Sequence, residues 1–421
     1  MEKQQTAVVI LSRKQIAAVA AGNALEFYDF LIFGFFAVPI SMVFFPSESP
    51  TSGLLRTLAI FGVGFLTRPL GGILIGPLGD RIGRKPAMLL SFGLMGVSVV
   101  GLALTPSYAS IGVAAPILLV LFRLVQGFAL GGEVGPSTAF LMEAAPANKR
   151  AFYVSVQFAT QQSAILVAGI VGVVLANLLS PEDLTAWGWR IAMLLGAAVV
   201  PLALAIRRTL PETLPQTERI NRPRLSGAQI RLALLTLFVL ASGTIATYAL
   251  ISINIFATHT LGLTAAQASG AGVIGGACGV IFSPIGGWLS DRFGRKPVMI
   301  VAFGLLCAVA LPCYMAMAQM RTPGVLYAAV ILMASLLAMG LPAIMTQISE
   351  GLPPRVRSGG IGIIYAVAIA LFGGTASFVV TWLTEVTGSP LAPAVYMCGA
   401  LALGVCCMFA LRETAPVKTG G

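Results

Sequence analysis

Charged residues are scarce in this chain. They make up 10% of its 421 residues, whereas hydrophobic residues make up 57%. Soluble globular domains carry about 25% charged residues, and they need this charge to cover a surface that faces water. The composition therefore excludes a water-soluble globular fold.

Patterns typical of catalytic and metal sites are also missing. The sequence has one histidine and contains no metalloprotease, P-loop or nucleophile-elbow motif. Its six cysteines all fall in apolar segments without the spacing of metal ligands, so we expect free thiols. We predict a protein that is not an enzyme and that needs no metal and no cofactor.

Long apolar runs, in contrast, recur along the chain. Most are near the roughly 20 residues that a helix needs to cross a bilayer, and they are continuously apolar, unlike the alternating strands of a membrane β-barrel. We predict an all-α membrane protein with twelve transmembrane helices, at 16–44, 55–78, 87–105, 111–142, 152–179, 190–206, 230–258, 267–289, 298–320, 325–348, 358–384 and 392–411.

The basic residues indicate how the chain lies in the membrane. With the N-terminus inside, most of the 26 lysines and arginines fall in loops on one side. Such loops face the cytoplasm, so we predict a multi-pass protein of the cell (inner) membrane with both termini cytoplasmic. The net charge of +11 then follows from topology, and we expect no nucleic-acid partner.

The chain repeats itself at half its length. The segment from Gly76 to Pro86 (GPLGDRIGRKP) recurs from Gly287 to Pro297 as GWLSDRFGRKP. A second echo relates 143–150 to 350–357, with a glutamate at the start and an arginine at the end of each. We therefore predict two six-helix bundles, at 1–206 and 230–421, joined by a polar cytoplasmic linker at 207–229. Parallel repeats of this kind are typical of transporters that rock two bundles around a central site.

Both copies of the repeated segment resemble the signature loop of the major facilitator superfamily. The finer resemblance is to the metabolite:proton symporters of that superfamily, and among them most to the citrate and tricarballylate symporters. It rests on motifs that follow the order seen in the family: 22–30 (GNALEFYDF), 123–127 (RLVQG), 131–133 (GGE), 187–191 (WGWRI), 207–213 (RRTLPET) and the Gln161–Gln162 pair.

This resemblance implies a proton-coupled symporter that imports citrate or a related tri- or dicarboxylate by alternating access, as a monomer. Its partners would be a small organic anion, protons and the lipid bilayer. Two alternatives stay open: symport of another metabolite, such as a dicarboxylate, an aromatic acid or a betaine, and export of small molecules by proton antiport.

Acidic residues inside the predicted spans are the first candidates for proton coupling. Only Glu26, Asp29 and Glu133 lie clearly within spans, where a charge needs a partner or a water-filled cavity. We expect Asp29 or Glu26 to exchange a proton while Arg123 pairs alternately with that carboxylate and with the substrate. The alternative is a static ion pair joining the first and fourth spans.

Other polar residues within the spans are candidates for substrate binding. Arg68 either neutralises substrate charge or bonds backbone groups freed by Pro69, and the sequence favours the structural role. The neutral candidates share a membrane location and hydrogen-bonding capacity, and for each the alternative is a bond between helices. They are Asn23, Tyr28, Gln126, Gln157, Gln161, Gln162, Tyr248, Asn254 and Tyr365.

The repeated loops are candidates for a conformational gate. Their aspartate and arginine groups can bond across the two helix ends in one conformational state only. We assign this role to Asp80, Arg81, Arg84, Asp291, Arg292, Arg295, Glu143 and Arg150.

Overall fold

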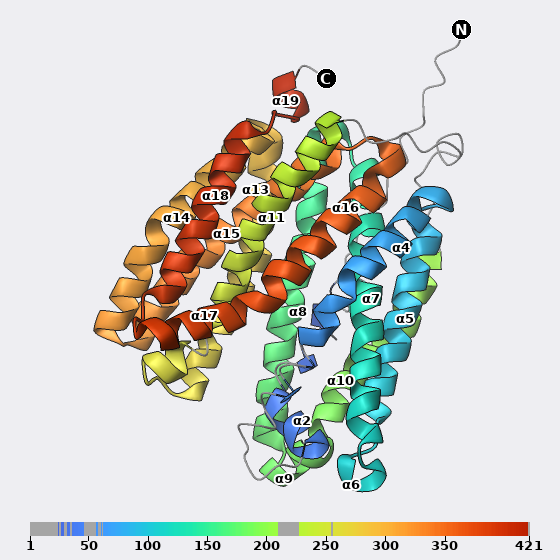
Figure 1. The fold of residues 1–421 in the computed structure, drawn as a ribbon, viewed down its shortest axis with the longest axis vertical. Coiled ribbons are helices and arrows are strands. Elements are labelled where there is room, and N and C mark those ends of the chain that lie inside the picture. The colour runs from blue at the N-terminus through green and yellow to red at the C-terminus, as the bar shows by residue number, and fades with distance from the viewer. Residues whose placement is uncertain are drawn as a thin grey trace.

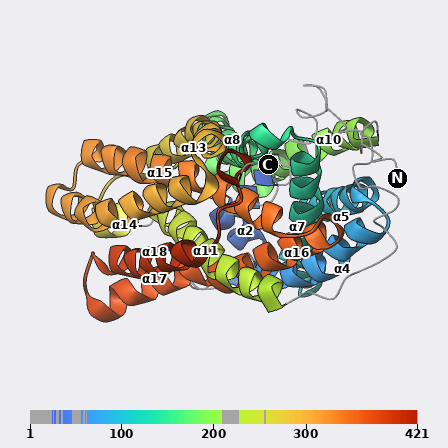
Figure 2. The same cartoon turned by 90° about the horizontal axis from the view of Figure 1, so that it is seen from above.

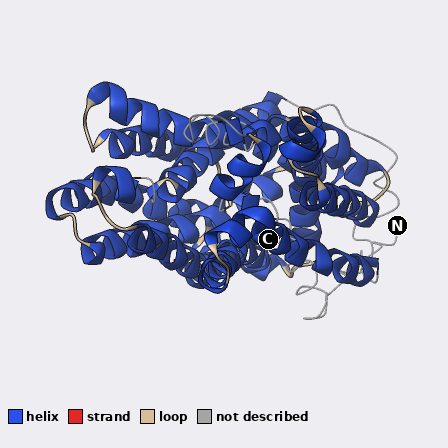
Figure 3. Ribbon diagram, turned by 90° about the horizontal axis from the view of Figure 1, so that it is seen from below, coloured by secondary structure: helices blue, strands red, loops and turns tan. Residues whose placement is uncertain are grey.

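The computed structural model describes residues 24, 27–28, 32–33, 36–45, 56–57, 60, 62–208, 227–253 and 256–419. Within these ranges the chain forms helices and connecting loops and no strand (Figure 3). The described helices include nine that are long and apolar enough to cross a membrane. Most of the first predicted span and most of the predicted linker lie outside the described residues.

The helices of the first half follow the predicted spans closely. The third, fourth, fifth and sixth spans correspond to α5, α7, α8 and α10, with ends shifted by a few residues. The described bounds are α2 (Ala37–Phe44), α4 (Arg68–Arg81), α5 (Arg84–Leu104), α6 (Tyr108–Ile111), α7 (Ala114–Glu143), η1 (Ala147–Lys149), α8 (Arg150–Leu178), α9 (Pro181–Asp183), η2 (Leu184–Gly188) and α10 (Trp189–Arg208).

The second half shows the same correspondence. The eleventh span is one continuous helical stretch in which a π-helical segment, η5, separates α16 from α17. The bounds are α11 (Gly227–Ile251), η4 (Phe256–Thr260), α13 (Ala265–Phe293), α14 (Arg295–Met320), α15 (Pro323–Gly351), α16 (Pro354–Ala368), η5 (Ile369–Gly373), α17 (Gly374–Thr387), α18 (Ala392–Ala410) and α19 (Pro416–Thr419).

Each repeated loop makes a sharp turn at a glycine. Gly83 and Gly294 have φ angles of 113° and 108°, a region that side-chain-bearing residues rarely adopt. Each is the residue immediately before a new helix, α5 or α14. The proline that follows in both copies lies in the first turn, where its missing N–H breaks no helical hydrogen bond. The motif thus fixes a helix–turn–helix joint in each half.

Both joints lie at one end of the molecule, at the top of Figure 1, and we call this the motif end. Figure 2 looks down on it and shows α8 beside α13, with α16 beside α4 and α7. These pairings are among the most extensive helix contacts in the molecule. The two halves of the chain therefore meet along two equivalent seams, the fifth span against the eighth and the second against the eleventh.

The outward faces of these helices are apolar. Leu70 and Leu74 on α4, and Val97 and Leu104 on α5, are all more than half exposed. Apolar surface on this scale is unfavourable in water and marks contact with an apolar phase. It fits helices that are surrounded by lipid.

Candidate functional site

A buried ion-pair cluster ties the first repeated loop to the second half of the chain. Arg84 contacts Asp80 at 2.5 Å and Glu143 at 2.9 Å, and its guanidinium also donates to the carbonyl of Pro354 at 2.9 Å. Glu143 is shared with Arg357 of α16, at 3.2 Å. The cluster thus contains groups from α4, α5, α7 and α16.

The second repeated loop forms an equivalent cluster. Arg295 contacts Asp291 at 2.6 Å and Glu350 at 3.0 Å. Glu350 is approached by Arg150 of the first half, at 3.7 Å. Each cluster therefore pairs an arginine of one loop with two carboxylates and adds an arginine from the opposite half.

Both motif aspartates also bind backbone amides of helices in the opposite half. The carboxylate of Asp80 accepts hydrogen bonds from the amides of Ser358 and Gly359 in α16, at 3.2 and 2.8 Å. In the equivalent contact, Asp291 accepts from the second and third amides of α8, at 3.0 and 2.8 Å. At the start of α8 the negative charge of Asp291 is favourable because the first N–H groups of a helix have no partner within that helix. The motif end is closed in this structure.

Two predicted gate residues stand apart from these clusters. Arg81 is exposed, and Arg292 lies over the rings of Trp288 and Phe293, at 5.5 and 5.6 Å from their centroids. One residue that sequence reasoning missed is Glu413, which accepts hydrogen bonds from the first two amides of α14 at 3.0 Å each. No repeated segment contains Glu413, whereas the repeat of 143–150 at 350–357 includes Glu350 and Arg357.

Glycines allow the halves to approach closely along both seams. A Cβ added to Gly135 of α7 would lie 2.2 Å from the carbonyl oxygen of Ser358, and one added to Gly72 of α4 would lie 2.7 Å from that of Gly362. On the other seam, a Cβ on Gly279 would lie 2.3 Å from the amide of Gln162. Real Cβ atoms essentially never come this close to other heavy atoms. The closed arrangement therefore requires glycine at positions 72 and 135, where the neighbour is backbone.

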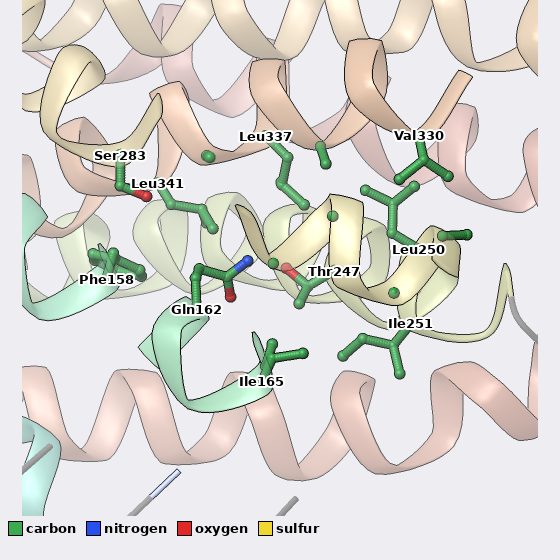
Figure 4. A pocket seen from close by; sticks show the side chains of 16 residues that line it. Phe158, Gln162, Ile165, Thr247, Leu250, Ile251, Ser283, Val330, Leu337 and Leu341 are labelled. Carbon is green, nitrogen blue, oxygen red and sulfur yellow. The ribbon is translucent and has the colours of Figure 1, made fainter. Parts of the chain in front are cut away.

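Two adjoining chambers lie between the halves. The first, about 120 Å³, lies among α8, α11, α13 and α15. The second, about 90 Å³, is lined by α4, α8, α11 and α16. Six residues line both: Phe158, Gln162, Ile165, Thr247, Ile251 and Leu341. Figure 4 shows Gln162 of α8 and Thr247 of α11 turned toward one another in the first chamber. Because ligand pockets usually measure about 300–1,000 Å³, these chambers are small.

The second chamber brings together a buried arginine and two tyrosines. Arg68, on the chamber wall and 2% exposed, interacts with the hydroxyl of Tyr248 and lies near Tyr365. Its guanidinium carbon is 4.4 Å from the ring centroid of Phe65, which itself packs edge-on against Tyr248. Guanidinium and phenol groups that face one cavity are donors suited to a carboxylate.

The predicted substrate-binding residues divide into three groups. Gln161, Gln162, Tyr248 and Tyr365 line the chambers. Asn23 and Asn254 lie outside the described residues, as do the predicted proton-coupling residues Glu26 and Asp29.

The remaining candidates make contacts between or within helices. Arg123 is fully buried on α7, donates to Gln126 at 2.5 Å and lies 4.5 Å from the ring centroid of Phe33. Gln157 is joined to α7 by hydrogen bonds that involve the hydroxyls of Thr138 and Ser137, at 2.9 and 3.2 Å. It therefore bridges α7 and α8.

Two further candidates are buried within the first half. The hydroxyl of Tyr28 donates to the carbonyl of Ala192 on α10, at 2.8 Å. Glu133 is fully buried on α7. We expected Arg123 at the substrate. The arginine that lines the second chamber is instead Arg68.

Comparison with known proteins gives the chain its family. Its residues 14–220 match the family described as "Sugar (and other) transporter", and residues 232–421 match "Major Facilitator Superfamily". A citrate-proton symporter of Klebsiella pneumoniae is 34% identical over 96% of this chain and 93% of its own length. This chain belongs to the major facilitator superfamily.

Other relatives in the superfamily carry different names. The alpha-ketoglutarate permease of Escherichia coli (strain K12) is 36% identical over 86% of this chain and 85% of its own length. Among solved structures, the proton:xylose symporter XylE bound to a sugar analogue matches with a TM-score of 0.79 at 20% identity, over 95% of this chain and 96% of that one. The predictions of a major facilitator fold and of a transporter rather than an enzyme are confirmed.

Proposed function

We propose that this transporter is a proton-coupled symporter that imports small organic acids by alternating access. The observation that carries the proposal is the buried Arg68, which faces a chamber between the two halves together with Tyr248 and Tyr365. The names of the relatives support the same class, since they include a citrate-proton symporter and an alpha-ketoglutarate permease.

In this proposal Arg68 holds the carboxylate of the substrate. A guanidinium presents a planar fork of donors that matches a carboxylate, and burial strengthens the resulting bonds because water does not compete. The tyrosine hydroxyls and the amides of Gln161 and Gln162 would complete the donor set. This role corresponds to the first of the two expected for Arg68. Citrate and related tri- and dicarboxylates are the substrates that the relatives suggest.

Proton coupling would arise in the first half. Arg123 lies close enough to Arg68 for the two like charges to repel. Two buried cations need anions nearby, because an uncompensated buried charge is strongly unfavourable. We infer that ionised Asp29 or Glu26 supplies this charge in the empty transporter, and that the substrate carboxylate replaces it once the acid is protonated. Glu133 is a candidate inner relay. Proton and substrate binding would then favour each other.

The closed motif end supplies the other element of alternating access. If it faces the cytoplasm, as the positive-inside rule predicts, the structure corresponds to a state closed toward the cytoplasm. Import would require the two seams to separate, which breaks the contacts of Asp80 and Asp291 with the opposite half. We propose that the halves at 1–206 and 230–421 rock in this way within a single chain in the inner membrane.

The experiment compares Arg68→Gln with a matched variant far from the chambers. Arg321→Gln, at the exposed end of α14, removes the same charge without touching the cavity. Purified protein in proteoliposomes is tested for uptake of labelled citrate, alpha-ketoglutarate and shikimate under an inward proton gradient. We expect Arg68→Gln to abolish uptake, Arg68→Lys to keep part of it and Arg321→Gln to match the wild type. Full activity of Arg68→Gln would refute the proposal that Arg68 holds the carboxylate of the substrate.

A further inference from the structure

The two chambers differ in chemistry. The chamber beside α4, which we call the polar chamber, is lined by Arg68, Gln161, Tyr248 and Tyr365, among others. The chamber among α11, α13 and α15, which we call the apolar chamber, contains no charged side chain among its described lining residues. Its polar side chains are Gln162, Thr247 and Ser283. One end of the cavity is thus suited to an anion and the other to an uncharged group.

Small residues create the space of the apolar chamber. Gly272, Gly275 and Gly276 of α13 line it together with Ala334 and Ala338 of α15. A Cβ on Gly275 would meet only Val330, at 3.6 Å, an ordinary contact distance. Leu337 and Leu341 extend the same wall, as Figure 4 shows. The surface is therefore apolar and has room for an apolar group of the ligand.

The charge on the chamber walls limits how many carboxylates can be held. Arg68 is the one charged side chain among the described residues that line either chamber. A carboxylate that reached the apolar chamber would lose its hydration without meeting a cation, which is strongly unfavourable. An apolar group there would instead gain from leaving water.

Resting on the proposed function, we infer that the preferred substrate is a monocarboxylate with an apolar body. Its carboxylate would bind Arg68 in the polar chamber, its middle would pass Gln162 and Thr247, and its body would fill the apolar chamber. Multiply charged acids such as citrate would bind more weakly. The inference narrows the substrate class of the same site.

Binding can be measured apart from transport. Isothermal titration calorimetry on detergent-solubilised protein would compare straight-chain monocarboxylates of two to six carbons with citrate. We expect affinity to rise by about fourfold for each added methylene until the chamber is full, because each buried methylene is worth about 0.8 kcal/mol. Citrate should bind at least tenfold more weakly than the best monocarboxylate.

A pair of variants on α15 tests where the body lies. Ala334→Leu fills the apolar chamber, whereas Ala328→Leu makes the same change on an exposed face of that helix. We expect Ala334→Leu to remove the gain from longer chains but to keep the affinity for the shortest acid. Ala328→Leu should behave as the wild type.

The outcomes separate this inference from the proposed function. If the protein binds citrate more tightly than every monocarboxylate and transports it under a proton gradient, the inference is wrong. The proposal of organic-acid symport is then unaffected. A chain-length dependence that survives Ala334→Leu would place the body elsewhere and would also overturn it. If folded protein neither binds any carboxylate nor takes one up under a proton gradient, both the inference and the proposed function are refuted.

Discussion

A single methyl group on α7 should open the motif end. Gly135 faces the second half of the chain, and a Cβ there would lie 2.2 Å from the backbone oxygen of Ser358. Contacts shorter than 3.0 Å are essentially never seen for real Cβ atoms. The helices α7 and α16 must therefore separate by about 0.8 Å, the difference between 3.0 Å and the 2.2 Å contact. Backbone cannot turn aside as a flexible side chain can.

The overlap lies between the halves, so it can be relieved by their separation. Overpacking costs about 1–3 kcal/mol in protein interiors. If the open state escapes this cost, Gly135→Ala should shift the ratio of open to closed molecules by about 5- to 150-fold. The fold of each half should survive.

Gly131 is the matched control. It lies one turn earlier on α7, but its added Cβ would meet the backbone oxygen of Arg68 at 2.0 Å, within the first half. Opening cannot relieve that overlap, so Gly131→Ala should lower the melting temperature.

The assay measures distances across the motif end. Spin labels at Ile82 and Phe293 occupy equivalent exposed positions in the two repeated loops. Pulsed electron paramagnetic resonance, in a background with the six native cysteines replaced, should show a larger long-distance population in Gly135→Ala than in the wild type. An unchanged distance distribution would refute the reasoning, as would equal opening in a stable Gly131→Ala variant.

Three further changes have defined outcomes. Asp80→Asn keeps the shape of the side chain but removes the charge that holds two amides of α16; since bonds to charged groups are worth about 1.5–3 kcal/mol, the same labels should report opening. Gln157→Leu leaves two buried hydroxyls of α7 short of a partner, so thermal denaturation should show a loss of about 1–3 kcal/mol while the KM for uptake stays unchanged. Glu413→Gln weakens the contact with the first amides of α14, and amide hydrogen exchange at the start of that helix should rise relative to the wild type.

Most of the fold could be predicted from the sequence because a bilayer leaves few choices. Apolar runs of about 20 residues must be helical, since backbone groups in lipid have to be satisfied within the helix. The repeat also placed the motif aspartates, because equivalent loops in parallel halves reach the same end. Helix ends were harder to predict: α8 begins at Arg150, two residues before the apolar run, because its first turn binds Asp291.

The central site was predicted less completely. Gln162 and Tyr365 were expected at the substrate and line the chambers, whereas Arg123 is buried beside Phe33. Depth along the helix axis could be estimated from sequence, but the direction in which each arginine faces could not. That direction depends on how α4 and α7 pack, through glycines such as Gly131 that bring their backbones together. Sequence spacing alone does not fix this rotation.

The most direct test of proton-coupled import is accumulation against a concentration gradient. Proteoliposomes containing the wild type should concentrate a labelled carboxylate only while an inward proton gradient is maintained, and should release it when an ionophore collapses that gradient. If Asp29 is the coupled acid, Asp29→Asn should still exchange internal for external substrate but should no longer accumulate it; if Glu26 is the coupled acid, Glu26→Gln should show this behaviour. Uptake that equilibrates at the same level with and without the gradient would contradict the account and would indicate a uniporter.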